Sequence, residues 1–323
     1  MVKFTIYTGG YTSFIVSYLF DTQTASLTYL DTIATTPDPS WITPHPTNPT
    51  LIYAVNEVAP LGALQVYETT PGGGLTLLDQ ISSGGNGPAF CAPLSTGQVA
   101  IMNYGSGNGE IIPTVNGGTK FDNSTTVLVT FPPPFNGTSN PHMAYEHGNE
   151  VFVPDLGGNK VWRIGRTGGP GDFSIHGFIP QPLGTGPRHM AILDDTIYLL
   201  HETANLLTAQ LIPPYPNGTV TPEFLANATT VPDDVPAGGT YAAAELLLSP
   251  TSLEYPHPLP LRVQPQHRRH ARPARRLHRD LRPDQQARAR AGEAGVHGAC
   301  GDPRDGARAW RGGGRVIWLR WGR

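Results

Sequence analysis

Short apolar segments that end on a polar residue recur at a nearly constant interval along the first 200 residues. They are Phe4–Thr8, Ile52–Asn56, Val99–Asn103, Val151–Asp155 and Ile197–His201. Their last residues lie 48, 47, 52 and 46 positions apart. Because the segments are rich in β-branched and aromatic residues, we expect each to form a strand. A repeat of this length is typical of a β-propeller, whose four-stranded blades take about 40–50 residues each.

Each repeat also contains strand-like pairs that are separated by a short turn. Examples are Tyr18–Asp21 followed by Leu27–Leu30, and Leu64–Tyr67 followed by Leu75–Leu78. We expect these pairs to form the outer hairpins of the blades. The 38 Gly, 33 Pro and only 15% charged residues leave little room for long amphipathic helices. The predicted fold class is therefore all-β, with about five blades readable in the chain.

A proline precedes the innermost strand of four repeats. The four prolines are Pro39, Pro88, Pro141 and Pro187, at intervals of 49, 53 and 46 residues. We interpret each as a turn residue that fixes how the chain enters the strand. Since equivalent positions of successive blades form a ring around the central channel, the residues after the prolines should lie at one mouth of it. These residues are Ser40, Ala89, His142 and Arg188.

The strand that pairs with each innermost strand should return to the same mouth. Its last residues in successive repeats are Asn56-Glu57, Asn103-Tyr104, Asp155 and His201-Glu202. A rigid β scaffold usually carries its functional site on strand ends and loops at such a mouth. The repeat therefore predicts a site that contains Glu57, His142, Arg188 and Glu202.

Charge is distributed very unevenly along the chain. Residues 1–257 contain six basic and 20 acidic side chains, a net charge of −14. Residues 258–323 contain 16 Arg, no Lys and five acidic side chains, a net charge of +11. We interpret 1–257 as an incomplete propeller body and 258–323 as an Arg-rich, disordered tail of different origin.

Several classes of protein and site are not favoured. No apolar run approaches the roughly 20 residues that span a bilayer, and no signal peptide is recognisable at Met1, so we expect a cytoplasmic protein with no membrane partner. The acidic body would repel nucleic acid. Cys91 and Cys300 lie far apart, and the histidines lack ligand spacing, so we expect no metal and no cofactor.

The chain resembles the seven-bladed β-propeller lactonase family, which includes 6-phosphogluconolactonase of the bacterial type and the 3-carboxy-cis,cis-muconate lactonizing enzyme of fungi. Matching motifs follow one another over about residues 3–250; among them are Tyr7-Thr8-Gly9-Gly10-Tyr11-Thr12, Tyr53-Ala54-Val55-Asn56-Glu57, Asn140-Pro141-His142, Gly186-Pro187-Arg188-His189 and His201-Glu202. The resemblance implies that His142, Arg188 and Glu202 are the active-site His, first Arg and Glu. The family's second active-site Arg, in an Asn-Arg pair, is absent from the chain as written.

A shift of reading frame would explain this absence. If the codons behind Leu261 to Arg282 are read one base further on, the genetic code allows an inner strand, the missing Asn-Arg pair and an outer hairpin, in that order. We therefore hypothesise a frameshift, a wrong intron boundary or a sequencing error near residues 250–261. A genuine disordered extension or a nucleic-acid-binding arm are the alternatives, although the tail lacks Lys and interleaved aromatic residues.

The candidate residues suit chemistry on a small anionic lactone or carboxylate. Arg188 can bind carboxylate or phosphate through two nitrogens, His142 can move a proton near neutral pH, and Glu202 can act as a base or orient a neighbour. The alternatives are a surface arginine, a loop histidine and a structural ion pair. Glu57 and His189 are weaker candidates for substrate binding, since each could simply satisfy backbone donors.

Together with these residues, the resemblance implies a lactonase that hydrolyses a sugar-acid lactone such as 6-phosphogluconolactone. The alternatives are a cycloisomerase that forms the lactone of 3-carboxy-cis,cis-muconate, and a propeller that serves as a non-catalytic binding scaffold. The sequence leaves the oligomeric state open. It also leaves open whether this chain is active, because a ring without its last blades exposes strand edges, and we expect such a chain to be unstable or to aggregate.

Overall fold

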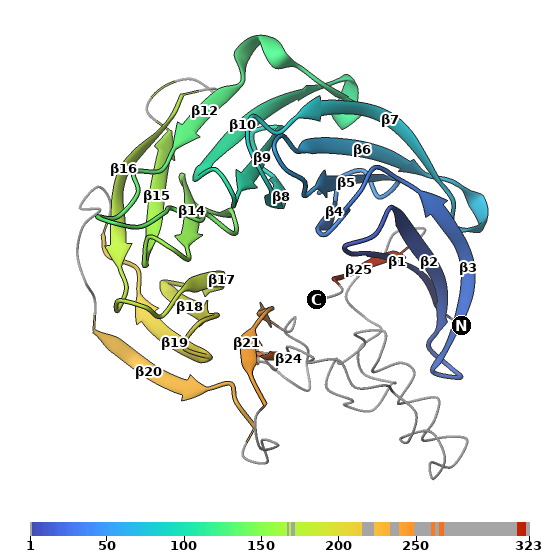
Figure 1. Cartoon of the computed structure of the whole chain (residues 1–323). Coiled ribbons are helices and arrows are strands. Elements are labelled where there is room, and N and C mark those ends of the chain that lie inside the picture. Colours follow the sequence, from blue (N-terminus) through green and yellow to red (C-terminus); the bar gives the residue numbers. More distant parts are fainter. Residues whose placement is uncertain are drawn as a thin grey trace.

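The chain forms a ring of β-sheet blades around a common centre (Figure 1). The computed structural model describes residues 2–166, 168, 172–214, 223–232 and 239–248, together with the backbone of strands at 260–261, 265–267 and 315–320. Each blade presents an innermost strand to the centre, whereas β3, β7, β12, β16 and β20 lie on the outside of the ring (Figure 1). No helix in the described part of the chain is long and apolar enough to cross a membrane.

Five sheets have at least four strands and account for most of the ring. Blade 1 contains β25 (Arg315–Arg320), β1 (Lys3–Gly9), β2 (Phe14–Asp21) and β3 (Ser26–Ala34). Blade 2 contains β4 (Ile42–Pro44), β5 (Leu51–Asn56), β6 (Ala63–Thr69) and β7 (Leu75–Ser82). Blade 3 contains β8 (Pro88–Pro93), β9 (Gln98–Asn103), β10 (Asn108–Val115), the short β11 (Lys120–Phe121) and β12 (Val127–Thr130).

The chain continues around the ring in the same way. Blade 4 contains β13 (Tyr145–His147), β14 (Glu150–Asp155), β15 (Lys160–Arg166) and β16 (Phe173–Pro180). Blade 5 contains β17 (Pro187–Leu193), β18 (Thr196–His201), β19 (Leu206–Leu211) and β20 (Phe224–Thr229). Two small sheets follow, in which β21 (Tyr241–Ala243) pairs with β24 (Pro265–His267) and β22 (Leu247–Leu248) pairs with β23 (Pro260–Leu261). We refer to β21, β22 and their connection as the sixth inner segment.

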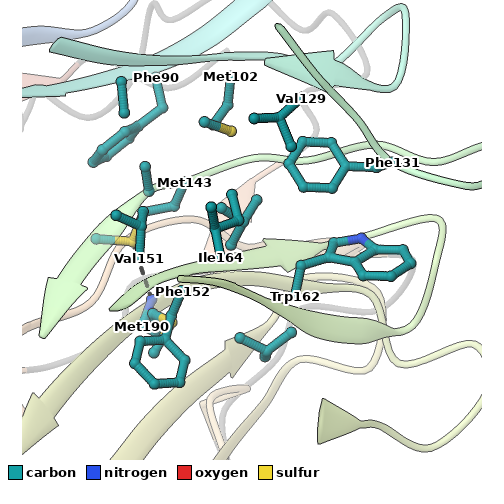
Figure 2. Packing of buried hydrophobic residues seen from close by; sticks show 14 of the residues in the cluster. Phe90, Met102, Val129, Phe131, Met143, Val151, Phe152, Trp162, Ile164 and Met190 are labelled. Atoms are coloured by element: carbon teal, nitrogen blue, oxygen red, sulfur yellow. Dashed lines mark hydrogen bonds between the residues drawn. The ribbon is translucent and has the colours of Figure 1, made fainter. Parts of the chain in front are cut away.

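Apolar side chains fill the space between consecutive blades. The largest cluster joins blades 3, 4 and 5, and its members Phe90, Met102, Phe152 and Met190 are at most 4% exposed (Figure 2). In the same view the backbone amide of Met190 donates a hydrogen bond to the sulfur of Met143 at 3.3 Å. Smaller clusters join blade 1 to blade 2, blade 2 to blade 3, and blade 5 to the sixth inner segment. The core is therefore a series of contacts between neighbours, as expected for a repeat architecture.

The all-β propeller and its five readable blades are confirmed. The five predicted recurrent segments lie within β1, β5, β9, β14 and β18, and the predicted outer hairpins are β2–β3 and β6–β7. Three short pieces of the expected tail, β23, β24 and β25, form strands. The rest of the tail and most of the proposed frameshift junction lie outside the described residues, so the disordered tail and the shifted frame stay predictions.

Blade 1 is completed by β25 in an unusual direction. In blades 2 to 5 the innermost strand runs antiparallel to its neighbour, as β4 does with β5 and β17 with β18. In blade 1 the innermost place belongs to β25, which runs parallel to β1 with Phe4 opposite Arg315 and Gly9 opposite Arg320. A segment distant in sequence therefore closes blade 1, but with the reverse of the direction that the other blades use.

Candidate active site

One backbone corner recurs in four blades and builds the mouth of the channel. In each, the amide that follows the second strand donates to the carbonyl of the residue before the proline. The pairs are Glu57 to Asp38 (2.9 Å), Tyr104 to Gly87 (2.9 Å), Leu156 to Asn140 (3.0 Å) and Glu202 to Gly186 (2.7 Å). The predicted ring of equivalent positions is therefore confirmed: Ser40, Ala89, His142 and Arg188 occupy one place in the corner, and Glu57, Tyr104, Leu156 and Glu202 occupy the facing place.

Three of these corners need a left-handed residue before the proline. The φ angles of Asp38, Gly87 and Gly186 are 56°, 60° and 66°. Glycine adopts this conformation without strain, and aspartate tolerates it better than most residues. At Gly186 a side chain would also meet the Thr203 hydroxyl, because an added Cβ would lie 2.5 Å from its oxygen. The Gly-Pro-Arg-His motif of blade 5 is thus required by backbone geometry as well as by its side chains.

Arg188 lies at a bulge that turns it toward Glu202. The register of β17 and β18 passes from the Pro187–His201 pair directly to His189–Leu200, which leaves Arg188 as the extra residue. Bulges of this kind often re-aim a side chain beside a functional site. The Arg188 guanidinium donates Nη1 to the Glu202 carboxylate and Nε to the Ala244 carbonyl at 2.9 Å. The pair is mostly buried, with side-chain exposures of 9% and 21%.

His142 is linked to the partly exposed Glu245 carboxylate through His189. The Nδ1 atom of His142 lies 3.2 Å from Nε2 of His189, and Nδ1 of His189 lies 2.6 Å from Oε1 of Glu245. His142 is 3% exposed and His189 is fully buried. The rings of Trp41 and Phe90 meet the His189 ring edge-on, with centroids 5.4 and 5.7 Å away. His189 therefore connects two polar groups from inside an aromatic environment.

A buried aspartate holds the turn that carries His142. Asp155 accepts hydrogen bonds from the Ser139 hydroxyl (2.6 Å), the Asn140 and Gly158 amides (2.7 Å each) and the Trp162 indole (2.9 Å). Charge-assisted bonds of this kind are stronger than neutral ones and fix geometry. The position of His142 therefore depends on Asp155, the last residue of β14, which lies at the mouth end of that strand.

Glu57 and Tyr104 complete the described side of the mouth. Glu57 accepts hydrogen bonds from the Ser40 hydroxyl and, at 3.4 Å, from the Tyr11 hydroxyl. Tyr104 packs edge-on against His142 at 5.6 Å between ring centroids. Burial raises the pKa of the Tyr104 hydroxyl, and the charges of Glu202 and Glu57 raise it further while Arg188 opposes them. Tyr104 thus lies within electrostatic reach of both carboxylates and stays a protonated donor at neutral pH.

The structure joins the residues that the sequence singled out in two separate contacts. Arg188 and Glu202 are in direct contact, and His142 reaches His189, the neighbour of Arg188 in the chain. Glu57 lies across the mouth, near Tyr104. Among the described residues, no group of three His, Cys, Asp or Glu side chains could hold a metal ion.

Sequence reasoning placed Tyr104 on the rim but did not choose it as a site residue, and it missed Glu245. Tyr104 occupies the same corner position as Glu57 and Glu202, so the repeat contained a signal that could have found it. No comparable signal in the sequence marked Glu245, because the sixth inner segment lacks the proline that marks the other corners. His189, a candidate for substrate binding, instead places both ring nitrogens on protein groups.

The sequence pattern of one protein family, described as lactonase, 7-bladed beta-propeller, matches residues 4–252. The chain belongs to this lactonase family. A comparison with curated proteins finds no significant match. Of the seven blades in the family's architecture, five blades and a sixth inner segment are described in this chain.

Solved structures share the fold of this lactonase-family protein at low sequence identity. A protein from Lactobacillus plantarum is 19% identical, with a TM-score of 0.66 and 82% of each chain covered. The periplasmic gluconolactonase of Pseudomonas aeruginosa is 21% identical, with a TM-score of 0.65 over 79% of this chain and 74% of that one. A candidate 6-phosphogluconolactonase from Bacteroides fragilis is 16% identical, with a TM-score of 0.62 and 80% of each chain covered.

Proposed function

We propose that this protein hydrolyses the lactone ring of a sugar acid, with 6-phosphogluconolactone as the first substrate to test. The observation that carries the proposal is the pairing of Arg188 with Glu202 next to the His142–His189 contact, at one mouth of the channel. Membership of the lactonase family and structural similarity to a gluconolactonase support it.

The proposed reaction is the attack of water on the lactone carbonyl. His142 takes a proton from the attacking water, which forms a bond to the carbonyl carbon as the C=O electrons move to its oxygen. Arg188 and the Tyr104 hydroxyl donate hydrogen bonds to the charge that develops on oxygen. When the carbonyl re-forms, the bond to the ring oxygen breaks and the leaving alkoxide takes the proton back from His142. The product is the open hydroxy acid, as its carboxylate at neutral pH.

Glu202 has a supporting role in this scheme. Its carboxylate accepts from Nη1 of Arg188 and so orients the guanidinium, whose Nε is held by the Ala244 carbonyl. A guanidinium fixed at two points loses little conformational freedom when a substrate binds. We therefore propose that Arg188 binds the substrate and that Glu202 positions Arg188.

The test is turnover of 6-phosphogluconolactone and of gluconolactone by the full chain, corrected for spontaneous hydrolysis. His142→Gln should lower kcat/KM by about 10²- to 10⁴-fold, because it removes the group that accepts the proton. His147→Gln is the matched control, since this half-buried histidine lies at the end of β13 and outside the mouth. A folded chain that converts 3-carboxy-cis,cis-muconate instead would support the cycloisomerase. One that turns over none of the three would favour a binding scaffold.

A further inference from the structure

We propose that Glu245 and His189 form a relay that sets the protonation and tautomer of His142, an inference that rests on the proposed function of His142. His189 and Glu245 are positioning residues in this arrangement, because they act through His142 and have no contact with the reacting atoms. The relay is carried by two contacts, His142 Nδ1 to His189 Nε2 at 3.2 Å and His189 Nδ1 to Glu245 Oε1 at 2.6 Å.

The direction of these hydrogen bonds follows from the chemistry of the groups. An ionised carboxylate only accepts, so the proton between Glu245 and His189 belongs to Nδ1 of His189. In the neutral ring the other nitrogen, Nε2, is then an acceptor, and it takes the Nδ1 proton of His142. His142 is left with its lone pair on Nε2, the nitrogen on the edge of the ring away from His189. The relay thus selects the tautomer in which His142 can accept a proton from water.

The relay also stabilises the protonated form of His142. When Nε2 takes the proton of water, His142 becomes a cation that still donates Nδ1–H to His189, and this proton can shift to Nε2 of His189. The positive charge then lies beside Glu245, and no proton has left the pair of rings. His189 is fully buried against Trp41 and Phe90, so the ring between His142 and Glu245 is shielded from water, whereas the Glu245 side chain is 29% exposed.

Other charged and titratable groups face the relay from neighbouring elements. Tyr104, from the end of β9, packs on His142, and the Arg188–Glu202 pair lies one residue from His189. Glu57 and Tyr11 affect Tyr104 from the far side of the mouth. Arg188 opposes a positive charge on His142, whereas Glu202 offsets Arg188. Glu245 supplies the carboxylate that contacts His189.

The three members come from three successive parts of the ring. His142 precedes β13 of blade 4, His189 lies in β17 of blade 5, and Glu245 follows β21 in the sixth inner segment. The residue before Glu245, Ala244, also receives Nε of Arg188. The sixth inner segment therefore orients both the arginine and the histidine of the proposed site.

The variant that isolates the charge is Glu245→Gln, which keeps an oxygen that can accept from His189. The titration of His142, followed by NMR on ¹³Cε1-labelled histidine in the full chain, should shift to lower pH by about one unit, because an opposite charge has been removed. The acid limb of the kcat/KM profile should move in the same direction. The His142→Gln variant identifies the NMR signal of His142. Glu68→Gln is the charge control: Glu68 is an exposed carboxylate in β6, and its removal should leave the His142 titration unchanged.

A second measurement needs no variant. In the unmodified chain, ¹⁵N shifts of the histidine rings should show the proton on Nδ1 of both His142 and His189 at neutral pH. A proton on Nε2 of neutral His142 would overturn the proposal, and so would a His142 titration unaffected by Glu245→Gln in a folded variant. If no lactone is turned over but the titration shifts as expected, the relay stands and the proposed hydrolysis fails.

Discussion

Two groups of Arg, Glu and His side chains lie in neighbouring blades and differ in their exposure to solvent. In blade 4, Arg163 donates Nε and Nη2 to Glu150 at 2.8 and 2.5 Å and Nη1 to the Pro213 carbonyl at 2.7 Å. His176 lies 2.8 Å from the same carboxylate. At the mouth, Arg188 contacts Glu202, and His189 contacts both Glu245 and His142. The side chains of the Arg163–Glu150 pair are 1% and 10% exposed, and those of the Arg188–Glu202 pair 9% and 21%.

This difference separates a structural role from a chemical one. Glu150 shares both oxygens with side chains of its own blade, and Arg163 is also bound to a carbonyl beyond β19, so the cluster connects blades 4 and 5. Arg188 lies at the bulge of β17, and its partner Glu202 is partly exposed. Three comparisons of variants test whether the roles are truly distinct.

The largest effect is expected for Arg163→Ala. It leaves the buried Glu150 carboxylate without its bidentate partner, which should lower the free energy of unfolding by about 3–5 kcal/mol. Denaturant unfolding measures the loss. Arg166→Ala is the control, since its pair with Glu146 is 23% and 20% exposed and should be worth under about 1 kcal/mol. Equal losses in the two variants would contradict a special role for the blade 4 cluster.

Arg188→Ala should reduce activity strongly and stability only slightly, the reverse of what we expect for Arg163→Ala. We expect kcat/KM for the lactone to fall by about 10²- to 10³-fold, as when one donor to a developing oxyanion is removed, with a smaller loss of stability than in Arg163→Ala. Turnover and unfolding are measured on the same preparation. If Arg188→Ala unfolded the protein as severely as Arg163→Ala while the folded fraction kept full activity, the mouth pair would be structural.

The smallest expected effect is a change in the free energy of unfolding at acid pH, caused by protonation of Glu150. Burial alone would raise the pKa of Glu150, but hydrogen bonds and charges from Arg163 and His176 outweigh it and hold the pKa below its usual range. A lowered folded pKa means that the carboxylate stabilises the fold above its unfolded pKa of about 4.3 and that this contribution is lost as the pH falls through the folded value. Urea unfolding from pH 7 to pH 3 should show this loss in the unmodified chain and a flatter acid side in Glu150→Gln. The acid limb of turnover should not change in Glu150→Gln, because Glu150 lies away from the mouth.

The mouth could be predicted because its geometry is local. The proline, the residue after it and the end of the partner strand are joined by one backbone corner, so equal spacing in the sequence becomes equal position in space. That reasoning placed His142, Arg188 and Glu202 correctly relative to the ring. It could not find Glu245, whose contact with His189 joins residues 56 positions apart across two blades.

Long-range pairing escaped prediction for the same reason. The parallel match of β25 with β1 joins the two ends of the chain, and no turn or alternation near residue 315 indicates its partner or direction. The burial of His189 was also hidden, because it depends on Trp41 and Phe90 from blades 2 and 3. Sequence periodicity therefore predicts the frame of each blade, whereas the packing of one blade on the next decides which polar residues are enclosed.

The recurrent corner has a consequence for how such a protein can acquire new chemistry. Main-chain hydrogen bonds hold all four corners, yet the residue after the proline is Ser40 in one, Ala89 in another, and His142 and Arg188 in the remaining two. The backbone does not depend on which side chain stands there. Each of these four blades thus offers a position at the mouth where the side chain differs while the main-chain corner is kept.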